Sequence, residues 1–258
     1  MIKIVIPVSG QDYQDMAAWA APTYALLMDR PDLLSVILPE DEPPNYLLSN
    51  HAKRFGFSLG TFKKPEKTHW KYTAPLKCSA FLQTVERLNH NDVVFMIDAD
   101  TVLYHPLEIS PVLSSKILRG YIGLAKCGGN FHVIDPDNPW FVPPEKRLTH
   151  VNSGVILAGR VSADMFKTFF ELSNKPQVVC ASLCDQLVIN YSLDMYYSDR
   201  FVLLDRCYNS MGPPVCQRQV AVPMISHMLG GPNNIHRGGR RDYHRNECMK
   251  ILRGKYDR

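Results

Sequence analysis

The sequence predicts an α/β fold in which a mostly parallel central sheet is flanked by helices. Apolar runs rich in β-branched residues, such as Ile2–Val8 and Val93–Ile97, are typical of parallel strands that are buried on both faces. Helical stretches alternate with these runs along the chain, which is the order found in βαβ units. The 258 residues are 45% hydrophobic and 21% charged, a composition that excludes disorder and allows one large core. A single α/β domain is therefore expected.

The first hundred residues alternate strands and helices. Ile2–Val8 is followed by Ser-Gly, and the helix expected over Gln14–Met28 contains Pro22, which either kinks it or begins a second helix. A strand over Leu33–Leu38 completes a β-α-β start. The other elements expected here are a helix over Asn45–Phe55, a loop over Gly56–Thr68, an amphipathic helix over Pro75–Leu88 and a strand over Val93–Ile97.

The remainder of the chain continues the alternation without a repeat or an obvious linker. The expected strands are Tyr121–Ala125, Val151–Ala158, Phe201–Leu204 and Val222–Ser226. The expected helices are Ala163–Leu172 and Asp185–Tyr191, with a short terminal helix over Glu247–Leu252. Gly, Pro, Asn and Arg dominate from Gly230 onward, which predicts a loop before that last helix.

Positive charge is concentrated at the C-terminal end. The net charge is +4, and residues 237–258 hold 8 Lys and Arg against 3 Asp and Glu, so residues 1–236 are nearly neutral. This distribution excludes a generally basic nucleic-acid-binding surface and points to an anionic partner near the C-terminus. We therefore divide the chain into a domain over 1–236 and a basic tail over 237–258 that we expect to pack on or near the site of that partner.

The cysteines and the N-terminus indicate the compartment. Seven cysteines are scattered without a C-x-x-C pair, which argues against a disulfide framework or a structural zinc site. The N-terminal apolar run is too short for a signal peptide, and no stretch of about 18 apolar residues follows. A cytoplasmic protein is expected.

The sharpest motif is a pair of carboxylates at the end of an apolar strand. Asp98 and Asp100 follow Val93–Ile97, with the small Ala99 between them. The carboxyl edge of an open α/β sheet is where ligands bind, and the two side chains point the same way if the extended geometry continues. Two such carboxylates suit a hard divalent cation. By itself such a motif is more often turn chemistry. The five apolar residues before it shift the balance toward a site.

Three weaker motifs follow in the sequence. Asn152-Ser153-Gly154 leads into a strand, and its amide and glycine suit either a ligand or a turn. Asp185-Gln186 opens a helix, where Asp185 either binds a ligand or only complements the helix dipole. His227 ends a short strand before a glycine-bearing loop with basic residues, a position that suits either a structural histidine or a third metal ligand beside a phosphate.

Taken in order, these four motifs resemble the glycogenin-like and bacterial galactosyltransferase-like retaining glycosyltransferases of family eight. The motifs are IDADTVL, VNSGVIL, CDQLVIN and SHMLGG, and the separations from Asp100 through Asn152 and Asp185 to His227 are 52, 33 and 42 residues. The resemblance implies the single-domain GT-A fold, a Rossmann-like fold of nucleotide-diphospho-sugar transferases. It also implies a hexosyl- or pentosyltransferase that moves a sugar from a UDP-sugar to a glycan or another hydroxyl acceptor.

The same resemblance implies roles for individual residues. A manganese ion, with magnesium as the alternative, would be held by Asp98, Asp100 and His227. The sugar and the reacting centre would be contacted by Asn152, Ser153, Asp185 and Gln186. The remaining donor contacts implied are Pro7, Val8, Ser9, Tyr13, Lys77, Ala99, Gly230 and Arg237.

The chain departs from the family pattern after His227. The family has a lysine where this sequence has Asn233, so we expect Arg237, His236 or Arg240 to supply the positive charge at the diphosphate. The segment between Asp100 and Asn152 is long, and we expect it to govern acceptor choice.

Other functions stay open at this stage. A sugar-phosphate nucleotidyltransferase shares the architecture, but Ser9–Asp15 lacks the basic, glycine-rich phosphate loop that it needs. A non-catalytic protein could use the basic tail to bind an anion such as a membrane surface or nucleic acid, although it would leave the four motifs unexplained. With a transferase as the first choice, no nucleic-acid partner and no transmembrane segment are expected, and peripheral membrane contact stays open. The donor sugar, the acceptor and the choice between retention and inversion do not follow from these residues.

Overall fold

The computed structural model describes residues 1–65, 74–127, 133, 135–175, 184–211, 225–227 and 240–256. The helices are α1 (Gln11–Leu27), α2 (Tyr46–Phe55), α3 (Ala74–Glu86), α4 (Pro111–Leu118), α5 (Ala163–Ser173), α6 (Cys184–Tyr196) and α7 (Arg240–Tyr256). The strands are β1 (Ile2–Pro7), β2 (Leu34–Pro39), β3 (Ser58–Phe62), β4 (Val93–Ile97), β5 (Thr101–Leu103), β6 (Ile122–Lys126), β7 (Val151–Gly159), β8 (Phe201–Leu204), β9 (Ser210–Met211) and β10 (Ile225–His227).

The strands form the mostly parallel sheet that the sequence predicts. Seven of them pair in the order β3-β2-β1-β4-β7-β6-β8. β1 pairs in parallel with β2, β2 with β3, and β6 with β8, whereas β6 and β7 are antiparallel. A second sheet has the order β5-β10-β9. The predicted fold class, α/β with helices flanking a mostly parallel sheet, is confirmed.

The chain groups into two compact units. The first unit holds Met1, 63–95 and 110–204, and the second holds 2–62, 96–109 and 205–258. The basic C-terminal segment belongs to the second unit, where it forms α7. The predicted division into a domain over 1–236 and a separate tail stays a prediction.

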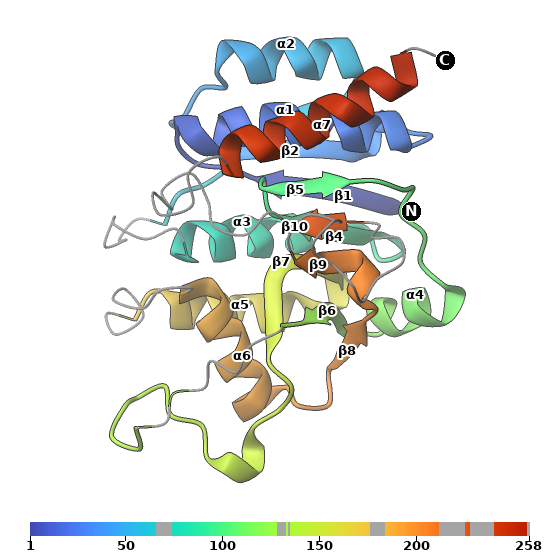
Figure 1. Ribbon diagram of the computed structural model, residues 1–258. Coiled ribbons are helices and arrows are strands. Elements are labelled where there is room, and N and C mark those ends of the chain that lie inside the picture. The colour runs from blue at the N-terminus through green and yellow to red at the C-terminus, as the bar shows by residue number, and fades with distance from the viewer. Residues whose placement is uncertain are drawn as a thin grey trace. The chain divides into compact units, whose positions relative to one another are not determined.

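The first unit is built around the packing of α3 on α5 and α6 (Figure 1). Phe81 of α3 meets Phe166 of α5 edge to face, with ring centroids 6.4 Å apart, and Phe166 meets Phe169 at 5.4 Å. All three rings are fully buried. Burial of such rings stabilises the fold by about 2–3 kcal/mol each, so this aromatic cluster fixes the helices that carry the polar residues described below.

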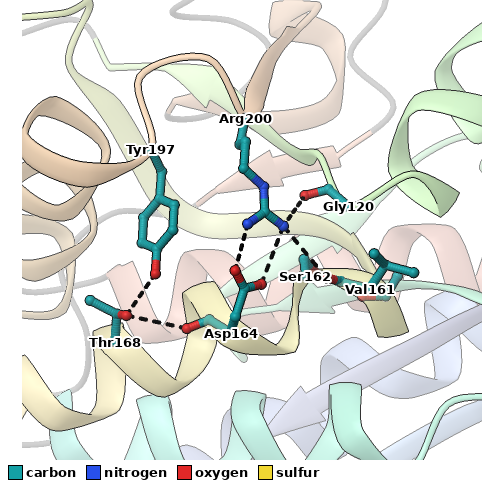
Figure 2. Close-up of polar contacts among 8 residues, drawn as sticks. Gly120, Val161, Ser162, Asp164, Thr168, Tyr197 and Arg200 are labelled. Atoms are coloured by element: carbon teal, nitrogen blue, oxygen red, sulfur yellow. Dashed lines mark hydrogen bonds and ion pairs between the residues drawn. The ribbon is translucent and has the colours of Figure 1, made fainter.

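A second group of contacts in the first unit, named here the Arg200 clamp, centres on the guanidinium of Arg200, as Figure 2 shows. The guanidinium binds both carboxylate oxygens of Asp164 on α5 and the carbonyl oxygen of Gly120, the latter at 3.1 Å. Gly120 has φ of +96°, and a Cβ there would lie 2.9 Å from Nη2 of Arg200. Glycine has no Cβ, so it adopts this positive φ without strain and leaves room for the guanidinium. The turn before β6 therefore requires a glycine at position 120.

The second unit has α1 packed against α2 and α7 (Figure 1). α2 begins at an Asn45 N-cap, whose side chain accepts a hydrogen bond from the Leu48 amide, and ends at Gly56 in the left-handed region. α7 is held by the Arg245 guanidinium, 5.0 Å from the Trp19 ring centroid, and by Glu247, which accepts a hydrogen bond from Tyr104. These contacts fix a helix with little amphipathic character of its own.

Several predicted elements are wrong in extent. The expected loop over Gly56–Thr68 contains β3, a strand in which only Phe62 is buried and whose residues show no clear apolar alternation. α1 continues through Pro22 as one helix, without a second helix beginning there. The terminal helix begins at Arg240 instead of Glu247, because tertiary contacts support its charged first turns. Within the described residues, β10 is the counterpart of the predicted strand Val222–Ser226, whose first three residues lie outside them.

Among the described residues, no helix has the length and apolar character needed to cross a membrane.

Candidate functional site

The acidic turn, defined here as Asp98-Ala99-Asp100, lies between β4 and β5 in the second unit. All five residues of β4 are buried, as the sequence predicts. Asp98 is half-buried, while Asp100 is only 6% exposed. The extended geometry does not continue past the strand, because β4 ends at Ile97 and the chain turns before β5 begins at Thr101. The hydroxyl of Thr101 donates to the carbonyl oxygen of Asp98 at 2.7 Å, which closes the turn.

The backbone of His227 lies beside this turn. β10 runs antiparallel to β5, and the register sets His227 opposite Thr101, the residue after Asp100. Two carboxylates and an imidazole are the oxygen and nitrogen donors that Mn²⁺ accepts, so the residue types fit such an ion. Among the side chains that the structure describes, which exclude that of His227, no three His, Cys, Asp or Glu residues gather as a metal site.

The residues expected at the donor base follow β1 in the same unit. Pro7 ends the strand, Val8 is buried, and its amide donates to the carbonyl oxygen of Ile37 at 3.0 Å. The Ser9 hydroxyl and the Gly10 amide each donate to the carboxylate of Glu42 at 2.7 Å. Gly10 has φ of +81° and precedes α1, in whose first turns Tyr13 is half-buried. Glu42 thus shapes this loop, and no motif in the sequence marks it.

The first unit brings Lys77, Ser153 and Asp185 together from three elements, namely α3, β7 and α6. The Lys77 ammonium and the Ser153 hydroxyl both donate to Oδ2 of Asp185, each at 2.7 Å. Burial raises the pKa of Asp185, but the charge of Lys77 and the two hydrogen bonds outweigh it and hold that pKa below its usual value. Asp185 is therefore an ionised hydrogen-bond acceptor at neutral pH.

Beside this group, a buried amide network links β7 to α6. The Asn152 amide donates to Oε1 of Gln186 at 3.0 Å and accepts from the Gly154 amide at 2.7 Å. The Asn152, Ser153 and Gly154 triplet lies within β7, where every residue is buried, and not in a turn before the strand. Gln186 also reaches Cys127 Sγ at 3.6 Å.

Asn190 completes the network, and the sequence motifs do not single it out for this role. Its side chain accepts from the Val151 amide at 2.8 Å and donates to the carbonyl oxygens of Val151 and Gln186 at 2.9 Å and 2.7 Å. It follows Gln186 by one helical turn, and its 4% exposure shows that these bonds are shielded from water. The only sequence signal for this role is a second amide one helical turn after Gln186.

Two predicted donor contacts, Gly230 and Arg237, lie outside the described residues, as does His236. Of the segment between Asp100 and Asn152, which we expect to govern acceptor choice, residues 128–132 and 134 also lie outside them. Arg240 is described by its backbone alone, as the first residue of α7. The roles expected of them stay predictions.

No protein-family model matches the sequence, and no curated protein matches it either. Solved structures do match. The galactosyltransferase LgtC, in complex with donor and acceptor sugar analogs, aligns with a TM-score of 0.61 at 14% identity, over 97% of this chain and 95% of that chain. Mouse xyloside xylosyltransferase 1, in its apo form, aligns with a TM-score of 0.57 at 14% identity, over 91% and 99%.

The chain has the GT-A fold. The alignments extend over nearly the whole of both matched transferases, so the GT-A fold accounts for almost the entire sequence. At 14% identity the likeness shows the fold and leaves the chemistry to be argued from the residues themselves. The resemblance that the four motifs indicate is confirmed at the level of structure.

Proposed function

We propose that this protein is a metal-dependent glycosyltransferase, which moves a sugar from a UDP-sugar to a hydroxyl group of a glycan or glycoconjugate with retention. The observation that carries the proposal is the acidic turn after the buried strand β4, with the backbone of His227 in register beside it, in a chain with the GT-A fold. In an open α/β sheet, this carboxyl edge is the ligand-binding edge.

The metal would be held by Asp98, Asp100 and His227, whose donor atoms fit manganese and, less well, magnesium. When bound, a divalent cation supplies Lewis-acid stabilisation to the negative charge of the departing diphosphate. We assign the base and ribose contacts to Pro7, Val8, Ser9 and Tyr13. Arg237 and the backbone of Ala99 and Gly230 complete the proposed contacts to the donor.

In the reaction, the acceptor oxygen bonds to the anomeric carbon while the bond from that carbon to the phosphate oxygen breaks. The electron pair of the broken bond goes to the diphosphate, and the acceptor proton passes to a phosphate oxygen, so no dedicated base is required. The bonds to Asp185 Oδ2 from Lys77 and Ser153 make this carboxylate a poor nucleophile and a fixed acceptor. We assign Asp185, Gln186 and Asn152 to orientation of the sugar and the acceptor.

The decisive experiment is a nucleotide-sugar screen with the full chain. We expect UDP and at least one UDP-sugar to raise the melting temperature in the presence of Mn²⁺, and that UDP-sugar to be hydrolysed slowly or transferred. Asp100→Asn should abolish both effects, because it removes a metal-binding charge without changing the side-chain volume. Asp29→Asn, at an exposed position outside the proposed contacts, is the matched control and should behave as the wild type.

Three results would contradict the proposal. These are turnover that needs no divalent cation, turnover that Asp100→Asn leaves unchanged, and a screen in which only a nucleoside triphosphate with a sugar phosphate reacts. The last would instead identify a nucleotidyltransferase.

A further inference from the structure

The main chain of the acidic turn is held in place by side chains from two distant helices. Thr101, fully buried, is the point at which they meet. Its hydroxyl donates to the carbonyl oxygen of Asp98 at 2.7 Å, and its oxygen lies 2.8 Å from the hydroxyl of Tyr24 on α1. A hydroxyl has one proton to give, so Tyr24 is the donor in the second bond. Tyr24 is itself fully buried, 77 residues from Thr101 in the sequence.

The second support comes from α7. Nε2 of His244 lies 3.1 Å from the carbonyl oxygen of Thr101, and the ring is 1% exposed. A carbonyl oxygen only accepts, so Nε2 carries the proton. Burial lowers the pKa of His244 despite the Thr101 bond and the charge of Asp100, which indicates a neutral ring with the proton on Nε2. Cys248, one turn later, lies 3.7 Å from the same nitrogen.

We propose that Tyr24 and His244 are positioning residues that fix the acidic turn for metal binding. Through Thr101 they restrain the carbonyl oxygens on both sides of Asp100, one at Asp98 and one at Thr101 itself. The separation of two metal-binding carboxylates depends on this stretch of main chain, and such groups must be held to within about 0.5 Å. The C-terminal helix, which lies outside the four motifs, thereby acts on the proposed metal site. The inference rests on the proposed function.

The test is Mn²⁺ affinity, measured on the full chain by electron paramagnetic resonance of the free ion, with the apo melting temperature recorded in parallel. Tyr24→Phe removes one hydroxyl, and His244→Leu removes the second donor. We expect each to weaken Mn²⁺ binding about tenfold, which is typical for loss of a group that orients a metal ligand. His244→Gln should recover part of the affinity, because its amide can donate from a place close to Nε2.

Tyr104→Phe is the matched control. It also removes a tyrosine hydroxyl that bonds to α7, at Glu247, from the residue directly after β5, but it does not remove a contact of Thr101. We expect it to lower the melting temperature and to leave Mn²⁺ affinity within about twofold of the wild type.

The outcomes separate the two proposals. If the wild type binds Mn²⁺ and Tyr24→Phe and His244→Leu bind it equally well, or lose no more affinity than Tyr104→Phe, the positioning role is overturned while the proposed function stands. If the wild type binds no Mn²⁺ with or without UDP, the metal-dependent function is itself overturned, and the positioning role with it.

Discussion

The ammonium group of Lys77 lies 2.7 Å from Oδ2 of Asp185, with side-chain exposures of only 14% and 17%. The two residues are 108 positions apart, on α3 and α6 of the first unit. A carboxylate so far removed from water is ionised because the lysine charge compensates its lost hydration. The pair therefore sets both the charge of Asp185 and part of the stability of this unit.

Lys77→Met should lower the free energy of unfolding by about 2 kcal/mol or more. Loss of one partner from a fully buried pair costs about 3–5 kcal/mol, and the residual exposure of this pair reduces that figure. Adding Asp185→Asn removes the uncompensated charge, so the double variant should lose less than Lys77→Met alone. Urea unfolding at pH 7 measures the stability of the wild type, Lys77→Met and the double variant. Lys167→Met, at an exposed position on α5, should stay within about 0.5 kcal/mol of the wild type. An equal loss from both methionine variants would contradict the pairing.

The pH dependence of stability should change sign when Lys77 is removed. In the wild type the pKa of Asp185 lies below the ordinary aspartate value of 3.8, so the unfolded chain binds the proton first as the pH falls. The stability that Asp185 contributes is then complete above about pH 4 and is lost as the pH falls through the lower, folded value. Without Lys77, burial, which is the largest influence on this pKa, is opposed only by the hydrogen bonds from Ser153 and the backbone. We therefore expect the pKa of Asp185 to rise above its ordinary value, so that acid favours the folded state of that variant.

Comparison of variants isolates this effect from other titrations. The stability difference between the wild type and Asp185→Asn should shrink below about pH 4, and the deficit of Lys77→Met should narrow over the same range. Urea unfolding between pH 3 and pH 7 gives both differences. A Lys77→Met deficit that is constant over this range would mean that Asp185 keeps its pKa without the lysine.

Sequence predicts best where a residue's role is set by its neighbours in the chain. A local apolar run predicts the buried strand β4 and marks the carboxylates after it as a candidate site. A local helical pattern places Asp185 at the start of α6. No local pattern predicts the pairing of Lys77 with Asp185, because three separate elements must fold before their side chains meet.

The residues that sequence reasoning missed share one property. Glu42, Tyr24, Asn190 and His244 act on groups far away in the chain, at separations of 32, 77, 39 and 143 residues. A glutamate in a turn or a tyrosine on an Ala-rich helix is equally consistent with an ordinary structural role, so the sequence does not single it out. The early start of α7 was missed for the same reason, since contacts such as those of Arg245 with Trp19 support charged turns that have no apolar face.

Gly120→Ala should destabilise the chain by about 1–3 kcal/mol. Its φ of +96° is strained for any side chain, and the added methyl would lie 2.9 Å from Nη2 of Arg200 and 3.1 Å from Val161 (Figure 2). Gly254→Ala on α7 is the matched control. A Cβ there meets nothing within 4 Å, and alanine favours the helix by up to about 1 kcal/mol. Thermal unfolding compares the two, and a tolerated Gly120→Ala would mean that the Arg200 clamp is not required.

Asn190→Asp should be strongly destabilising at pH 7 and less so in acid. The amide nitrogen of Asn190 donates to the carbonyl oxygens of Gln186 and Val151, at 2.7 Å and 2.9 Å. An ionised carboxylate would turn an oxygen toward both carbonyls in a site that is 4% exposed, at a cost of about 3 kcal/mol or more. Protonation restores one donor, so we expect a raised pKa for the introduced carboxyl and a recovery of stability as the pH falls toward 5.

Asn190→Leu is the control, because it leaves the same carbonyls without a donor but cannot titrate. Its deficit, measured by urea unfolding beside that of Asn190→Asp, should therefore stay constant with pH. Parallel curves for the two variants would show that the bonds to Val151 and Gln186 do not determine the cost.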